Sequence, residues 1–173
     1  MKTANLHIPP TPNLHLRGYL LENVYLRTTA AQRSEMIALW HKEAVDRDRT
    51  ETERRSHQAV FLVRAGSGEL AGLSTVGLVR VEGGRKFYAY RMFLRKRDRV
   101  PYLMVTVTQA TRDFLRNFAH PEFQPSGMLI VAGNPKLMRP GVQKLFARHG
   151  CRYWGKTPWG EDVWAVDFGE RNE

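Results

Sequence analysis

Cysteine is nearly absent from the sequence, since Cys151 is the only one in 173 residues. No disulfide can form within the chain, and a reducing compartment, the cytoplasm, is the expected location. No apolar run approaches the roughly 20 residues that a membrane-spanning helix needs, so no membrane partner is expected. The six histidines show no metal-ligand spacing, and no metal site is predicted.

Acidic residues are scarce in one part of the chain. Between Gly83 and Lys156 there are fifteen lysines and arginines but three acids, and from Phe123 to Gly160 there are six bases and no acid. The net charge of the whole chain is +10, so this block carries all of the excess. An anionic partner is the inference from such a block, and plain colloidal solubility is the alternative.

The composition is otherwise that of an ordinary globular protein, with 42% hydrophobic and 25% charged residues. The length suits one compact domain with a proper core. Residues 1–23 contain Pro9, Pro10 and Pro12 and no clear period, which predicts an extended arm before a domain at 24–173.

Hydrophobic periods and turn residues predict an alternation of strands and helices in that domain. Strands are expected at 24–29, 59–65, 69–81, 85–94, 127–133, 151–156 and 161–168, and helices at 30–45, 101–119 and 134–150. Segment 46–58 is almost wholly charged or polar, which is typical of a solvated helix or loop. Pro101 can open its helix, Pro140 breaks or delays the next one, and Gly150 stands where a C-terminal cap belongs.

Three strands in quick succession, joined by short glycine-containing connections, indicate an antiparallel meander. A helix, a buried strand, another helix and a terminal strand pair follow. This order predicts a mixed α/β (α+β) fold, with a mixed, mostly antiparallel sheet flanked by helices in a single domain.

The order of elements from Val24 to Phe168 resembles the GNAT superfamily of acyl-CoA-dependent N-acyltransferases. The segment "YRMFLRKRDRVPYLMVTVTQATRDFL" is similar to that family's fourth strand, pyrophosphate loop and long helix, and "MLIVAGNPKLMRPGVQKLFARHGCRYWG" to its next strand, helix and closing strand. The resemblance implies a GNAT-like domain that transfers an acyl group from acetyl-CoA or another acyl-CoA to a small-molecule or protein amine. The acceptor and the oligomeric state cannot be read from the sequence.

Two motifs depart from the family's pattern. Aligned on Arg97, the loop has Val100 and Tyr102 where the family has small residues that admit the pyrophosphate to backbone amides. Phe146 stands four residues before Gly150, where many members carry a tyrosine that protonates the leaving thiolate. These departures leave open an alternative function, a catalytically silent GNAT-like module that binds a protein or a nucleic acid through its basic face. Aromatic residues interleaved with the basic block favour nucleic acid by composition alone.

The start of the long helix is the predicted cofactor site. A helix N-terminus presents unpaired N–H groups and a positive dipole end, and Arg95, Lys96, Arg97 and Arg99 could add side-chain charge there. The resemblance implies that Asn134 and Lys136 lie across the same cleft. The predicted cofactor-binding residues are Phe93, Leu94, Arg95, Arg97, Arg99, Val100, Pro101, Tyr102, Leu103, Asn134 and Lys136.

For catalysis, Tyr88 or Tyr90 could replace the missing acid, because both lie on one face of the 85–94 strand. The alternative is that both are core aromatics. His41 and Glu43 are candidate bases only by family topology, and an exposed helix end is the simpler interpretation. Cys151 is expected to be a small buried hydrophobe.

Overall fold

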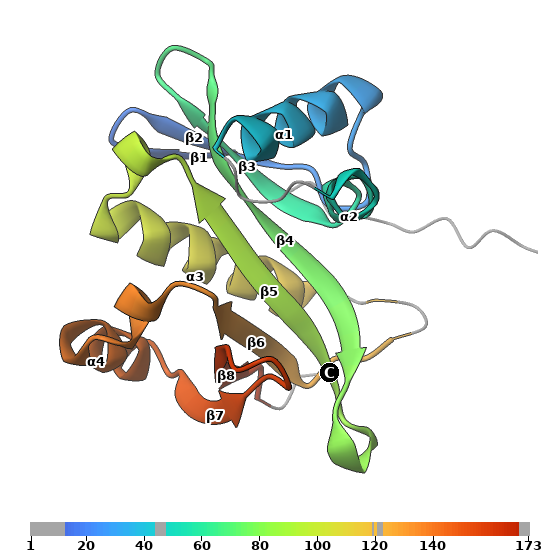
Figure 1. Ribbon diagram of the computed structural model, residues 1–173, viewed down its shortest axis with the longest axis vertical. Helices are drawn as coiled ribbons and strands as arrows, with labels where there is room; N and C mark the ends of the chain where they lie inside the picture. The colour runs from blue at the N-terminus through green and yellow to red at the C-terminus, as the bar shows by residue number, and fades with distance from the viewer. Residues whose placement is uncertain (1–12, 44–47, 119, 121–122, 170–173) are drawn as a thin grey trace, which may run out of the picture. The chain divides into compact units, whose positions relative to one another are not determined.

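The computed structural model describes residues 13–43, 48–118, 120 and 123–169. The chain forms two compact units, which we call the first unit (Met1–Thr75 with Met92–Pro121) and the second unit (Val76–Arg91 with Glu122–Glu173). Two long strands, β4 (Leu70–Arg80) and β5 (Lys86–Leu94), run through both units (Figure 1).

The first unit has the strand order β1-β2-β3-β4, and all of these neighbours are antiparallel. Its strands before β4 are β1 (Leu14–Leu16), β2 (Tyr19–Asn23) and β3 (Ala59–Ala65). Its helices are α1 (Ala30–Lys42), α2 (Arg49–Ser56) and α3 (Pro101–Asn117), and a 3₁₀ turn, η2 (Lys96–Asp98), precedes α3.

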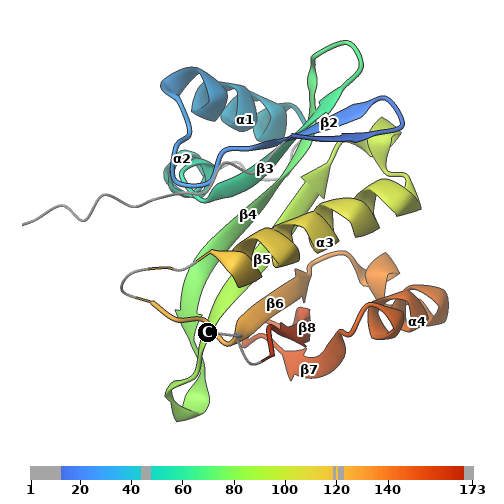
Figure 2. The same ribbon diagram turned by 180° about the vertical axis from the view of Figure 1, so that it is seen from behind.

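Helices α1 and α3 cover opposite faces of strand β3. Leu62 belongs to the cluster that buries Trp40 of α1, whereas the ring of Phe61 lies 6.2 Å from that of Phe114 in α3. Because neighbouring side chains of a strand point to opposite faces, the two helices must lie on either side of it. Figures 1 and 2, seen from opposite sides, show α1 in front of the sheet in one view and α3 in front in the other.

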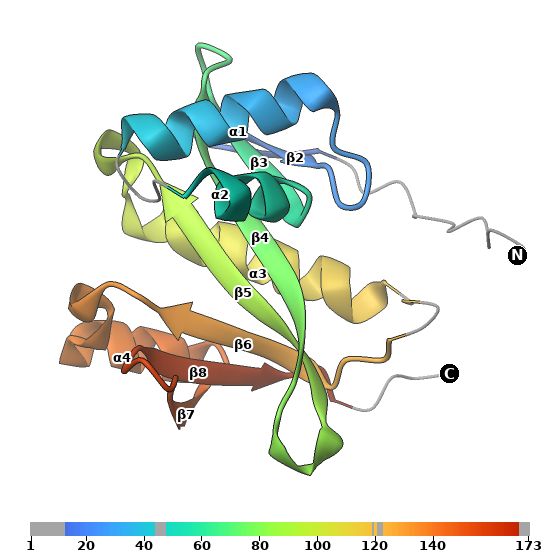
Figure 3. The same cartoon turned by 45° about the vertical axis from the view of Figure 1, so that its right-hand side comes forward.

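The second unit has the strand order β5-β6-β8-β7, in which β5 and β6 are parallel and the other neighbours antiparallel. Its further elements are β6 (Gly127–Ala132), β7 (Arg152–Lys156), β8 (Asp162–Asp167), α4 (Pro140–Arg148) and the 3₁₀ turns η1 (Glu82–Gly84) and η3 (Pro135–Met138). Figure 3 shows β6 and β8 side by side. Phe87, Leu129, Val163 and Ala165 form one core, and Phe146 of α4 packs on Trp164 with the ring centres 5.2 Å apart.

The predicted fold class is confirmed: in the described residues, eight strands contribute to a mixed, mostly antiparallel sheet, and four α-helices accompany them. The meander, the helix that begins at Pro101, the late start at Pro140 and the glycine after α4, with φ of 76°, lie where the sequence predicts them. Within the described residues, no helix is long and apolar enough to cross a bilayer.

One predicted strand is misplaced. The structure has no strand at 24–29; β2 ends at Asn23, and Leu26 lies in a turn with φ of 60°. Thr29 still caps α1, because its side chain accepts a hydrogen bond from the Gln32 N–H while the Gln32 side chain accepts one from the Thr29 N–H. Residues 14–23 of the predicted arm form a hairpin that pairs with β3. The predicted division at residues 23 and 24 stays a prediction, and residues 1–12 of the arm lie outside the described part of the chain.

Strand β4 approaches the end of β5 too closely for a side chain at Gly72. A Cβ atom built there would collide with the Phe93 carbonyl oxygen and lie 2.6 Å from Leu94 Cδ2. We therefore expect Gly72→Ala to lower the free energy of unfolding by roughly 2–3 kcal/mol, because backbone must move. Gly141→Ala is the matched control, since nothing lies within 4 Å of a Cβ in that turn of α4. Chemical denaturation of both variants checks this, and equal stabilities would contradict it.

Candidate active site and the pocket at the end of strand β5

A buried ion pair holds the turn that leads from β5 to α3. Arg95 Nε donates to Asp98 Oδ2 at 2.7 Å, and the two residues are only 8% and 6% exposed. The Tyr19 hydroxyl donates to the other oxygen, Oδ1, at 2.8 Å. The Arg95 N–H also donates to the Ala71 carbonyl at 2.8 Å. With each charge compensated and hydrogen-bonded, the pair fixes the conformation of η2.

Two further arginines of the basic run (Arg95, Lys96, Arg97 and Arg99) also contact polar groups of the protein. Arg97 Nη2 lies 2.8 Å from Glu69 Oε2, and Arg95 Nη1 lies 3.3 Å from the same oxygen. The hydrogen bond from Arg95 and the charges of both arginines hold the pKa of Glu69 below its usual value. Arg99 Nε donates to the Leu94 carbonyl at 2.9 Å. Of the four basic residues, only Lys96 makes no ion pair or side-chain hydrogen bond with a described residue.

The first turn of α3 offers fewer amides than a helix start usually does. Pro101 has no N–H, and the N–H groups of Leu103 and Met104 both donate to the Val100 carbonyl, at 3.1 and 3.3 Å. Among the described residues, the N–H of Tyr102 has no acceptor. Its ring lies under the guanidinium of Arg17, 4.8 Å from the ring centre.

The other predicted cofactor residues are placed as follows. Phe93, Leu94 and Leu103 are buried in the first unit. Asn134 and Lys136 belong to the second unit, where Asn134 Oδ1 caps η3 by accepting from the Lys136 N–H at 3.0 Å. Their location opposite the basic run stays a prediction.

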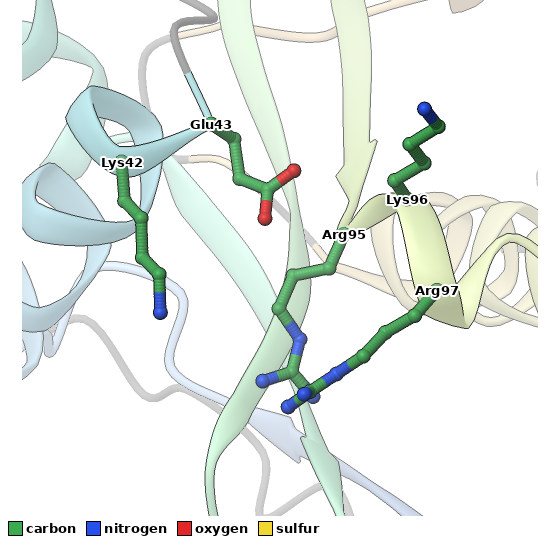
Figure 4. Close-up of a pocket in the computed structure, with 5 residues that line it drawn as sticks. All are labelled: Lys42, Glu43, Arg95, Lys96 and Arg97. Atoms are coloured by element: carbon green, nitrogen blue, oxygen red, sulfur yellow. The ribbon is translucent and has the colours of Figure 1, made fainter.

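A pocket of about 440 Å³ lies in the first unit between the end of α1 and the turn η2. Five residues line it: Lys42, Glu43, Arg95, Lys96 and Arg97 (Figure 4). In Figure 4 the side chains of Lys42, Arg95 and Arg97 extend to one side, and Lys96 extends to the other. Glu43, one of the candidate bases, therefore faces a pocket, whereas His41 is exposed on α1.

Strands β5 and β6 are paired over only three residues of the second unit. The parallel ladder joins Tyr88 to Met128, Ala89 to Leu129 and Tyr90 to Ile130, and among the described residues of the second unit it goes no further, although Arg91 and Val131 continue the two strands there. Tyr90 is thus the last residue of β5 before the ladder ends. Tyr88 and Tyr90 are 0% and 2% exposed, and Tyr88 packs 6.2 Å from the ring of Phe168.

An acid–base cluster near the end of β6 was not predicted from the sequence. Arg91 Nη2 lies 3.1 Å from Glu161 Oε2, which also accepts from the indole N–H of Trp159 at 2.6 Å. Burial raises the pKa of Glu161, but the hydrogen bonds from Arg91 and Trp159 outweigh it, so that the pKa lies below its usual value. Glu161 Oε1 would lie 2.9 Å from a Cβ at Gly133, so the carboxylate lies beside the residue that directly follows β6. Seventy residues separate Arg91 from Glu161, so no local pattern could have indicated the pair.

In the described residues, no group of three or more His, Cys, Asp or Glu side chains is placed to hold a metal ion. Cys151 is buried, as predicted for a small hydrophobe.

The buried pair predicts a sharp contrast between two carboxylates. We expect Asp98→Asn to lower the free energy of unfolding by about 3 kcal/mol, because it leaves the charge of Arg95 inside the protein without its main partner. Glu69→Gln should lower it far less, because the contact of Glu69 with Arg97 is exposed to solvent and screened. Thermal or urea denaturation of the two variants tests this, and a larger loss in Glu69→Gln would overturn the assignment.

Comparison with known proteins yields similarity in structure alone. No protein-family model matches the chain, and no curated protein sequence is significantly similar to it. Ribosomal-protein-S5-alanine acetyltransferase from Vibrio fischeri superposes with a TM-score of 0.64 and 10% identity, over 94% of this chain and all of that one. A GNAT-family N-acetyltransferase from Escherichia coli, solved in complex with CoA, gives 0.59 and 13%, over 94% and 86%. A GNAT-family acetyltransferase from Streptococcus pneumoniae gives 0.58 and 12%, over 85% and 96%.

The chain therefore has the GNAT fold over most of its length, as the order of its elements predicts.

Proposed function

We propose that this protein is an N-acyltransferase that transfers an acyl group from acetyl-CoA or another acyl-CoA to an amine. The observation that carries the proposal is the early end of the β5–β6 ladder at Tyr90, because strands that stop pairing leave backbone groups available to a ligand. The GNAT fold supports it, since one similar structure is a GNAT-family N-acetyltransferase in complex with CoA.

In this proposal, side chains replace amides in binding the phosphates of CoA. The first turn of α3 has only the Tyr102 N–H to offer, because Pro101 has no N–H and that of Leu103 donates to the Val100 carbonyl. Lys96 and Arg97 are exposed at the turn that precedes α3, and they supply the charge. Arg95 acts on the turn through Asp98, and Arg99 through the Leu94 carbonyl.

The chemistry is direct attack of a neutral amine on the thioester carbonyl carbon. A C–N bond forms, the C–S bond breaks, and the amine proton leaves to solvent or a base. Backbone N–H groups near Phe93 and Leu94 polarise the carbonyl oxygen, and a tyrosine protonates the leaving thiolate. Phe146 cannot do so, since it has no proton to give and packs on Trp164. Tyr90 is the better candidate than Tyr88, because it stands where the ladder ends.

Calorimetric titration with acetyl-CoA tests the binding step. We expect saturable binding, weakened about tenfold in Lys96→Met combined with Arg97→Met, because charge-assisted phosphate contacts are lost. Lys144→Met combined with Arg148→Met removes the same charge from α4 in the second unit and is the control. No heat from the wild-type protein at high-micromolar ligand would contradict the proposal.

Thioester cleavage in the presence of a panel of amines tests the acid. Tyr90→Phe should lower kcat on the order of a hundredfold, the low end of what general acid catalysis contributes, with KM for acetyl-CoA little changed. Tyr88→Phe should stay close to wild type, because Tyr88 lies two residues before the point where the ladder ends and packs beside Phe168. Equal losses in the two variants, or none in either, would remove Tyr90 from the mechanism.

A further inference from the structure

The pocket between α1 and η2 has an excess of positive charge. Four of its five lining residues are cationic, and Glu43 is the one acid. Lys42 and Lys96 make no ion pair with any described residue. The guanidinium of Arg95 is buried and is held in place by Asp98 from one side, so its position does not depend on a ligand.

A surface carboxylate already contacts two of these cations. Glu69 comes from the turn between β3 and β4, and its Oε2 atom receives both Arg97 Nη2 and Arg95 Nη1. The Glu69 side chain is 60% exposed and that of Arg97 is 66% exposed. An ion pair so open to water contributes little, so another anion could replace the carboxylate at low cost.

The pocket lies on the α1 side of the first unit, whereas α3 covers the opposite face of β3. The side chains of Lys42, Arg95 and Arg97 therefore extend to the same side from α1 and from the segment after β5, whereas that of Lys96 points the other way (Figure 4). The carboxylates of Glu43 and Glu69 limit the excess charge. This balance suits one phosphate or carboxylate group better than a chain of several phosphates.

We propose that the pocket is a subsite for a single anionic group, a phosphate or a carboxylate, and that Glu69 is an intramolecular competitor for its arginines. The incoming anion displaces the Glu69 carboxylate from Arg95 and Arg97 and gains Lys42 as a further partner. No covalent bond changes. That the pocket binds an anion does not depend on the proposed function. Only the identity of the biological ligand rests on it: either a phosphate of the acyl-CoA or an anionic group of the acceptor.

The test is calorimetric titration of the full chain with inorganic phosphate at low ionic strength. Glu69→Ala should bind phosphate about three- to tenfold more tightly than wild type, because the competitor is gone. Lys42→Met should bind it more weakly by a similar factor. Glu82→Ala and Lys144→Met change the charge equally in the second unit and should stay within about twofold of wild type.

The proposal is overturned if Glu69→Ala merely matches Glu82→Ala, since the effect would then be general electrostatics. It is equally overturned if phosphate binding does not saturate in any variant. Circular dichroism and thermal denaturation confirm that each variant is folded before it is titrated.

Titration with acetyl-CoA then identifies the source of the anion. If phosphate competes with acetyl-CoA and Lys42→Met weakens both, the subsite holds a phosphate of the acyl-CoA. If acetyl-CoA binds Lys42→Met and wild type equally, the subsite serves the acceptor. Either of these two results supports an anion subsite in the pocket. Phosphate binding that responds to Glu69 and Lys42 in a protein that does not bind acetyl-CoA would reject the proposed function and keep the subsite.

Discussion

Arg95 and Asp98 place opposite charges 2.7 Å apart where little of either side chain is exposed, and the geometry at the end of β5 follows from that contact. The pair closes the turn η2, and the Asp98 carbonyl then accepts the Val100 N–H that precedes α3. The Tyr19 hydroxyl ties strand β2 to the same carboxylate. Breaking the pair would leave a charge inside the protein, so the turn cannot relax cheaply. A rigid turn is also what a binding site needs, because it orients exposed neighbours such as Lys96 and Arg97 before a ligand arrives.

Most of the fold could be predicted because its signals are local. Prolines at 101 and 140 mark helix starts, and short glycine turns separate the strands of the meander, so each element is encoded within its own segment. Segment 24–29 misled the prediction because its apolar and β-branched residues suit a strand equally well. Which residues form the strand is set instead by the pairing of β2 with β3. This pairing joins residues about forty positions apart, such as Leu21 and Val63.

The sequence predicted which basic residues lie at the candidate site, but not which carboxylates pair with them. The sequence shows four basic residues before Pro101, and it shows Asp98 only as a minority charge among them. In the folded chain Asp98 becomes the partner of Arg95, and Glu69, which is 26 positions away from Arg95, adds a second contact. A tertiary contact of this kind leaves no period or spacing in the sequence. The same holds for Arg91 and Glu161, which meet only because β5, β6 and β8 are neighbours.

Val100 and Tyr102 change how phosphates could be bound at this turn rather than whether they could be. Amides of a helix start are fixed dipoles that lose little entropy when a ligand arrives, and small residues let the ligand reach them. Here Pro101 has no amide and the Val100 carbonyl accepts that of Leu103, which leaves the Tyr102 N–H and exposed cationic side chains to do the binding. Lysine and arginine carry a full charge but lose rotamer freedom on binding, and solvent ions screen them. Affinity built in this way depends on ionic strength more steeply than affinity built on backbone dipoles. It can also be adjusted by a single carboxylate such as that of Glu69, which needs only to stand near the same arginines.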